Sequence, residues 1–133
     1  MLGQRQWPVS IGRLDFNTEG HGRPFRNSAA VLQKGRDIIR VQKSRLPTYD
    51  VFDEDRYFEP ATENAPVEFN GRKIGVTICE DIWTENFLPR AYYDVDPVRS
   101  LVEQGAELIV NLSSSPFSLG KPEVRRALVA ALA

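Results

Sequence analysis

Short apolar runs separated by turn residues predict two β-hairpins in the first two thirds of the chain. Residues 27–43 alternate apolar and polar positions on both sides of a Lys-Gly-Arg turn, which is the pattern of two paired strands. Residues 67–69 and 72–79 flank Asn70-Gly71, a dipeptide strongly favoured at two-residue hairpin turns. The strand over residues 72–79 should therefore run antiparallel to its predecessor.

The last third of the chain changes to a helical pattern, returns to a strand, and ends in a helix. Asp96 and Pro97 are typical of an N-cap and a first helical position, and Gly105 is typical of a helix end. A strand is predicted at residues 108–112 and a second helix over residues 121–133. Strand, helix and strand in this order predict a βαβ unit with a right-handed crossover, and hence an α/β fold.

Two stretches show weaker periodicity. A short strand is expected at residues 7–11, followed by a loop up to Arg26 in which glycine and proline surround His21. We interpret His21 as an exposed loop histidine. Residues 44–65 carry four aromatic residues without periodicity. They predict a long ordered loop, and loops of this length are usually functional.

Composition narrows the class of protein. The 133 residues are 41% hydrophobic and 26% charged, which is ordinary for one modest globular domain. A net charge of −1 with interspersed signs argues against nucleic acid or an acidic membrane as a partner. Without an apolar span or a signal-peptide pattern, a cytoplasmic protein is expected. One cysteine and one histidine form neither an internal disulfide nor a tetrahedral zinc site, so no metal site is predicted.

The single cysteine, Cys79, is the first candidate for chemistry. It ends an apolar run and precedes Glu80 and Asp81, which places its thiol at the rim of the predicted sheet, where α/β proteins bind ligands. A reactive thiol beside two carboxylates needs a nearby cation, and Lys43 ends the other predicted hairpin. Lone cysteines are more often inert and strand-end lysines more often solvated, so position alone assigns no function.

The amino-acid sequences of several segments are more specific than the positions of Cys79 and Lys43. The chain resembles the nitrilase superfamily, and within it the glutaminase domain of glutamine-dependent NAD synthetases. The resemblance covers most of the chain and rests on five segments in the same order, residues 27–32, 42–49, 51–58, 75–83 and 111–117.

This resemblance implies a fold and a set of catalytic residues. The fold is a nitrilase-type α-β-β-α sandwich, of which residues 1–133 would be a central fragment truncated at both ends. Cys79 would be the nucleophile, while Lys43 and the backbone amide of Glu80 would stabilise the oxyanion. Glu54 would be the supporting acid that orients Lys43, although a solvated charge run is an equally good interpretation of its segment.

The resemblance also implies a glutamine pocket. A zwitterionic amino-acid head needs both charge signs in its binding site, and the corresponding positions supply them. The implied substrate-binding residues are Tyr49, Glu80, Ser113, Ser115 and Lys121.

The resemblance also implies partners for this chain, and two alternative functions stay open. The ammonia would pass to a synthetase domain that amidates deamido-NAD, and ATP and magnesium would belong to that absent domain, leaving the glutaminase part without a cofactor. Exposed sheet edges of a partial domain predict a homo-oligomer. One alternative is another nitrilase-type amidase. The other is a non-catalytic fragment, because the general-base glutamate has no recognisable counterpart and we leave Glu19 unassigned.

Overall fold

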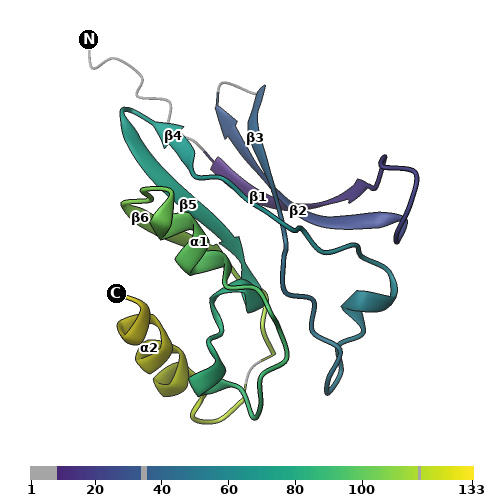
Figure 1. Cartoon of the computed structure of the whole chain (residues 1–133). Helices are drawn as coiled ribbons and strands as arrows, with labels where there is room; N and C mark the ends of the chain where they lie inside the picture. The colour runs from purple at the N-terminus through teal and green to yellow at the C-terminus, as the bar shows by residue number, and fades with distance from the viewer. Residues whose placement is uncertain (1–8, 34–35, 117) are drawn as a thin grey trace.

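The computed structural model describes residues 9–33, 36–116 and 118–133, which form two small sheets and two helices (Figure 1). The sheets pack face to face, and both helices lie against the second sheet on the side away from the first. The elements are β1 (Val9–Phe16), β2 (Phe25–Gln33), β3 (Arg36–Gln42), β4 (Val67–Phe69), β5 (Arg72–Ile78), α1 (Pro97–Glu103), β6 (Leu108–Leu112) and α2 (Lys121–Leu132), with short 3₁₀ turns η1 (Glu54–Arg56), η2 (Cys79–Ile82) and η3 (Glu85–Phe87).

The first sheet has the order β1-β2-β3, with both neighbouring pairs antiparallel. The predicted hairpin over residues 27–43 is therefore confirmed. The predicted strand at residues 7–11 is too short: β1 continues to Phe16, which pairs with Phe25, while residues 7 and 8 lie outside the described residues. Cross-strand pairing explains the extension, because the rings of Phe16 and Phe25 lie 5.7 Å apart and no local pattern reports such a contact.

The second sheet has the order β4-β5-β6 and confirms both predicted connections. Strands β4 and β5 are antiparallel across Asn70 and Gly71, whose φ angles of 51° and 73° are the positive values that a type I′ turn requires. Strands β5 and β6 are parallel and are joined through α1, which begins after Asp96. The Asp96 side chain accepts a hydrogen bond from the backbone N–H of Arg99 at 3.0 Å, as an N-cap does.

The main core fills the space between the sheets. Its buried members come from β2, β3, β4 and β5 and are Ala29, Val31, Val41, Val67, Val76 and Ile78. A second cluster, Ile82, Val98 and Leu128, packs η2 and the two helices together. Val41 and Ile78 are the last buried core residues of β3 and β5, so Lys43 and Cys79 lie at the edge of the core, and Cys79 packs against it. Among the described residues, no helix has the length and apolarity needed to cross a membrane.

Candidate active site

Lys43 lies directly after β3, and only 1% of its side chain is exposed. Its Nζ lies 2.7 Å from both carboxylate oxygens of Glu54, the first residue of η1. Glu54 also accepts a hydrogen bond from Asn27 Nδ2 on β2 at 3.2 Å. A buried ammonium requires such a partner because an unpaired charge is costly to remove from water. The long loop over residues 44–65 therefore returns to the lysine that precedes it and encloses the ammonium.

Cys79 stands at the turn between β5 and η2. Its φ of 48° lies in the left-handed region, which residues with a Cβ rarely adopt, so the cysteine carries backbone strain of the kind found at functional sites. The thiol donates to the Ser114 carbonyl across 3.9 Å, and the Cys79 carbonyl accepts a hydrogen bond from Asn111 Nδ2 at 3.4 Å. The segment after β6 thus lies beside the thiol, as the parallel pairing of β5 and β6 predicts.

Asp81 joins the cysteine turn to the segment after Lys43. Its Oδ1 accepts hydrogen bonds from the backbone N–H groups of Ser44 at 3.0 Å and Arg45 at 2.9 Å, and its Oδ2 accepts from Ile78 N–H at 3.0 Å. Burial raises the pKa of the Asp81 carboxyl, while these donors and the nearby Lys43 ammonium oppose that rise. One buried carboxylate therefore fixes the ends of β3 and β5 relative to each other.

Glu80 is enclosed on the other side of the same turn and is bound by two tyrosines. Its Oε1 accepts hydrogen bonds from the hydroxyls of Tyr49 and Tyr93, the second at 3.3 Å. Burial and the neighbouring Glu80 charge raise the pKa of both tyrosines, which keeps them protonated donors at neutral pH. The ring of Tyr49 stacks on Tyr92 with centroids 5.2 Å apart, so aromatic side chains surround the carboxylate.

Arg45 holds the loop that carries Tyr92 and Tyr93. Its side chain is buried and donates hydrogen bonds to the carbonyls of Trp83 and Val95. Its guanidinium carbon lies 5.5 Å from the centre of the Tyr93 ring, within the range of a cation–π contact. The aromatic wall beside Glu80 is therefore anchored to the residue that directly follows Ser44.

The remaining predicted residues follow β6 and are less enclosed. Ser113 is exposed, Ser115 is half-buried, and Lys121 begins α2. Lys121 Nζ donates to the Pro116 carbonyl at 3.0 Å, so the amine lies over the loop that contains both serines. The structure brings this segment to Cys79 through Ser114, and the substrate roles of Ser113, Ser115 and Lys121 stay predictions.

Sequence reasoning missed part of this arrangement. It did not identify Asn27 and Asp81 as residues that hold the site, or Tyr93 as a partner of Glu80. The signal for Asp81 was its position two residues after Cys79, where a buried acid must bond to the turn around it. Tyr93 and Asn27 gave no local signal, because their partners lie 13 and 27 residues away.

Comparison with known proteins identifies the family. The carbon–nitrogen hydrolase model matches residues 1–131. The chain is 47% identical over 104 residues to the glutamine-dependent NAD(+) synthetase of Synechocystis sp., a match that covers 77% of this chain and 19% of the relative. It is 45% identical over 119 residues to the enzyme of the same name from Thermotoga maritima, covering 89% of this chain and 18% of the relative.

Solved structures give a consistent result. A glutamine-dependent NAD+ synthetase from Acinetobacter baumannii, in complex with ADP, superposes with a TM-score of 0.77 at 34% identity, over 94% of this chain and 21% of that one. A carbon–nitrogen hydrolase from Helicobacter pylori superposes with a TM-score of 0.66 over 94% of this chain and 39% of that one; at 24% identity it shows the fold alone.

These matches confirm the predicted nitrilase-type α/β fold and its resemblance to NAD synthetases. The chain spans about a fifth of the length of the synthetases it matches. Within that span lie the cysteine turn, the enclosed lysine and the acid that holds it, and the chain belongs to the carbon–nitrogen hydrolase family of enzymes.

Proposed function

We propose that this chain contributes the nucleophile and the oxyanion-stabilising cation of a glutaminase, in which Cys79 attacks the side-chain amide of glutamine. The observation that carries the proposal is the buried Lys43 ammonium, held by Glu54 and joined through Asp81 to the cysteine turn. A fixed cation that one buried carboxylate connects to the turn of a strained, partly buried thiol is an arrangement suited to acyl transfer.

The reaction proceeds through a thioester. The Cys79 sulfur forms a bond to the amide carbon, and negative charge develops on the oxygen, where the Lys43 ammonium and the Glu80 backbone N–H stabilise it. The thiol proton moves to a general base and then to the departing nitrogen, so the carbon–nitrogen bond breaks and ammonia leaves. Water then attacks the thioester, releasing glutamate and the free thiol.

We assign no general base among residues 9–33, 36–116 and 118–133. Glu54 is bound to Lys43 and Asn27, which suits it to hold the lysine rather than to accept the thiol proton. Glu19, the earlier carboxylate that the sequence left unassigned, pairs with Arg26 at 2.7 Å. The base step is therefore separate from the roles that we propose for Lys43 and Cys79.

The residues around Glu80 favour an amino-acid amide over a simple aliphatic amide. The Glu80 carboxylate, presented by the hydroxyls of Tyr49 and Tyr93, suits the α-ammonium of glutamine. Lys121, with Ser113 and Ser115 on the other side of Cys79, would bind the α-carboxylate. A point charge such as lysine holds a carboxylate with less directionality than a bidentate arginine.

The relatives named glutamine-dependent NAD(+) synthetases suggest the fate of the ammonia. We propose that it supplies an ATP-dependent amidation of deamido-NAD in a synthetase domain, where ATP and magnesium would bind. Among the described residues, no group of three or more His, Cys, Asp or Glu side chains is placed to hold a metal ion, so these residues do not fit that site. No step proposed for Cys79 passes through ATP or magnesium.

Covalent labelling of the purified chain with a diazo-ketone analogue of glutamine tests the proposal. Intact-mass analysis should show one adduct, which excess glutamine prevents and which Cys79→Ala abolishes. Propionamide at the same concentration is the matched competitor, because it has the amide without the amino-acid head. If iodoacetamide still alkylates Cys79 but the analogue gives no glutamine-protected adduct, the chain carries a non-functional site and the proposal is wrong.

A further inference from the structure

The irregular segment over residues 54–61 contacts both the side-chain ammonium and the backbone carbonyl of Lys43. The Glu54 carboxylate binds its Nζ, and the backbone N–H of Ala61 donates to the Lys43 carbonyl at 2.9 Å. The backbone carbonyl of Glu54 in turn accepts hydrogen bonds from the N–H groups of Tyr57 at 3.1 Å and Phe58 at 2.9 Å. The position of the Glu54 carboxylate therefore depends on what fixes residues 57–61.

The beginning of β2 supplies that support. Phe25 and the segment exchange two backbone hydrogen bonds, one from Phe25 N–H to the Tyr57 carbonyl at 3.3 Å and one from Glu59 N–H to the Phe25 carbonyl at 2.8 Å. The rings of Phe25 and Phe58 lie 6.4 Å apart. The segment is thus attached to the end of β2 like a short additional strand.

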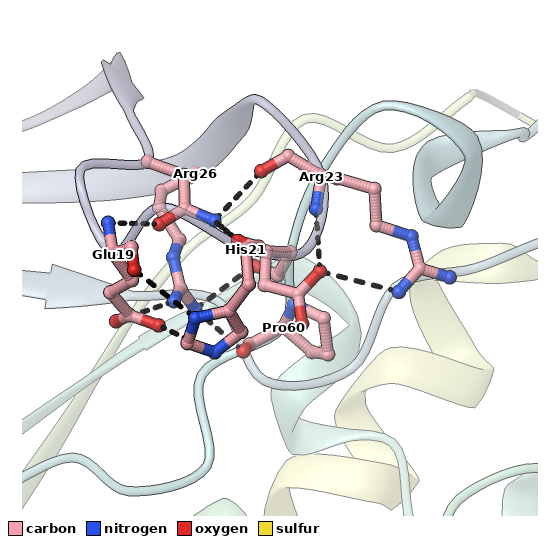
Figure 2. A network of polar contacts seen from close by, with 7 residues as sticks. Glu19, His21, Arg23, Arg26 and Pro60 are labelled. Atoms are coloured by element: carbon pink, nitrogen blue, oxygen red, sulfur yellow. Dashed lines mark hydrogen bonds and ion pairs between the residues drawn. The ribbon is translucent and has the colours of Figure 1, made fainter.

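Arg26, the second residue of β2, is buried in this attachment, with 5% of the residue exposed. Its guanidinium donates to the Pro60 carbonyl at 2.7 Å and to the Glu59 carbonyl at 3.4 Å, and it pairs with Glu19 Oε1 at 2.7 Å. Figure 2 shows Arg26 between Glu19 and Pro60. One buried arginine therefore bridges the β1–β2 turn and the segment that ends at Ala61.

Arg23 supports the same segment from its outer side. Its backbone N–H donates to Glu59 Oε2 at 2.9 Å, and its guanidinium pairs with Asp55 Oδ2 at 2.8 Å. Gly22 makes this approach possible, because a Cβ there would lie 2.6 Å from the Glu59 carboxylate. Asp55 directly follows Glu54, so Arg23 holds the residue next to the lysine's partner.

We propose that Arg26 is a positioning residue for the Lys43–Glu54 pair. It fixes residues 59 and 60, and through the backbone bonds of residues 57–61 it keeps the Glu54 carboxylate on the Lys43 ammonium. Its importance for catalysis rests on the proposed glutaminase function, whereas its effect on the enclosure of Lys43 does not. An unpaired buried guanidinium would be costly to remove from water, which explains why Arg26 is paired with Glu19 and two carbonyls.

The acetylation rate of Lys43 tests this inference without reference to glutamine chemistry. Trace acetylation with acetic anhydride, followed by peptide mass spectrometry, reports how often each lysine becomes accessible. Arg26→Met keeps the length of the side chain but loses the charged donors, so Lys43 should react about tenfold faster. The exposed Lys73 in the same sample should react at an unchanged rate, and Arg99→Met, which removes an exposed arginine from α1, should change neither lysine.

Two further variants keep the test decisive if Arg26→Met unfolds. Glu19→Gln removes only the half-exposed acid partner of Arg26 and should raise Lys43 acetylation by about twofold to threefold. Arg26→Lys should restore part of the protection. Unchanged Lys43 acetylation in both Glu19→Gln and a folded Arg26→Met would overturn the inference. If the parent chain shows no glutamine-protected labelling but Lys43 is acetylated faster in Arg26→Met than in the parent, the positioning role is supported and the glutaminase function is rejected.

Discussion

The two sides of Cys79 are built differently. On one side, Lys43, Glu80 and Asp81 are buried, and each makes at least two hydrogen bonds to protein groups. On the other side, residues 113–116 and 118–120 are mostly exposed, and the Ser114 carbonyl approaches the thiol at 3.9 Å.

This difference separates two kinds of role. A transition-state charge is stabilised by groups fixed before the reaction begins, because fixed groups need not reorganise when the charge appears. A substrate end can be held by exposed groups, which contribute less because water competes with them. Lys43 on the buried side should therefore control the rate of bond formation, whereas Glu80 and the exposed segment, which are proposed to hold the two ends of the substrate, should control its affinity.

Replacement of the buried cation should have the largest effect. Lys43→Met removes the proposed oxyanion donor, and we expect Cys79 labelling by the glutamine analogue to slow about 100-fold to 1000-fold. Glu54 would lose its charged partner, so the free energy of unfolding should also fall. Lys73→Met, at an exposed lysine, is the control for loss of charge. A labelling rate within about threefold of the parent would contradict the role of Lys43.

Replacement of the connecting carboxylate should come next. Asp81→Asn keeps the shape but places an amide donor against one of the backbone N–H groups that Asp81 now binds. We expect the free energy of unfolding to fall by about 1–3 kcal/mol in urea titrations, because a buried donor is left unsatisfied. Asp94→Asn, at an exposed position, should be neutral. Equal stabilities of the two variants would show that Asp81 does not fix the strand ends.

Removal of one tyrosine hydroxyl should give a moderate effect on affinity. Tyr49→Phe leaves Glu80 with Tyr93 as its hydroxyl donor, and we expect the inhibition constant of the glutamine analogue to rise about tenfold. The maximal labelling rate should stay close to that of the parent. Tyr57→Phe provides the control, since Tyr57 is exposed. A fall in maximal rate at unchanged affinity would place Tyr49 in the chemical step instead.

Replacement on the exposed side should have a smaller effect. For Lys121→Met we expect the inhibition constant to rise by about twofold to fivefold, in keeping with a solvent-accessible ion pair. Arg126→Met, on the same helix, tests whether the loss is specific to Lys121 or reflects the general charge of α2. The comparison would fail if Lys121→Met slowed labelling as strongly as Lys43→Met does.

The smallest effect should come from the support behind Glu54. The Arg23 backbone N–H lowers the pKa of Glu59, so the folded state holds this charge more strongly than the unfolded chain, whose glutamate pKa is about 4.3. The stabilisation is present above that pH and is lost as the pH falls through the lowered pKa. Glu59→Gln should therefore cost less than about 1 kcal/mol near neutral pH and nothing near pH 2. An equal loss at both pH values in urea titrations would contradict this origin.

The fold could be predicted where local chemistry decides it. Asn70-Gly71 gives the hairpin turn because its residues accept positive φ, and Asp96-Pro97 gives the start of α1 because the cap and its partner lie three residues apart. The length of β1 could not be predicted, because the pairing of Phe16 with Phe25 depends on a turn whose geometry is set by hydrogen bonds within residues 17–24.

The candidate site shows the same limit. The positions of Cys79 and Lys43 at strand ends could be predicted, because residues adjacent in the sequence determine them. Asp81 bonds to residues 36 and 37 positions earlier, and Arg26 bonds to carbonyls 33 and 34 positions later, so no window of sequence reports either contact. These long-range polar contacts form only when the two sheets pack together, so the sequence alone does not reveal them.

The most direct test of this account separates the maximal labelling rate from the inhibition constant for Lys43→Met and Lys121→Met, measured side by side with the glutamine analogue. Lys43→Met should lower the maximal rate at nearly constant affinity, and Lys121→Met should weaken affinity at nearly constant rate. If Lys43→Met changed only affinity, or Lys121→Met lowered the maximal rate, the division between a buried Lys43 that acts in the chemical step and an exposed Lys121 that only binds the substrate would be wrong.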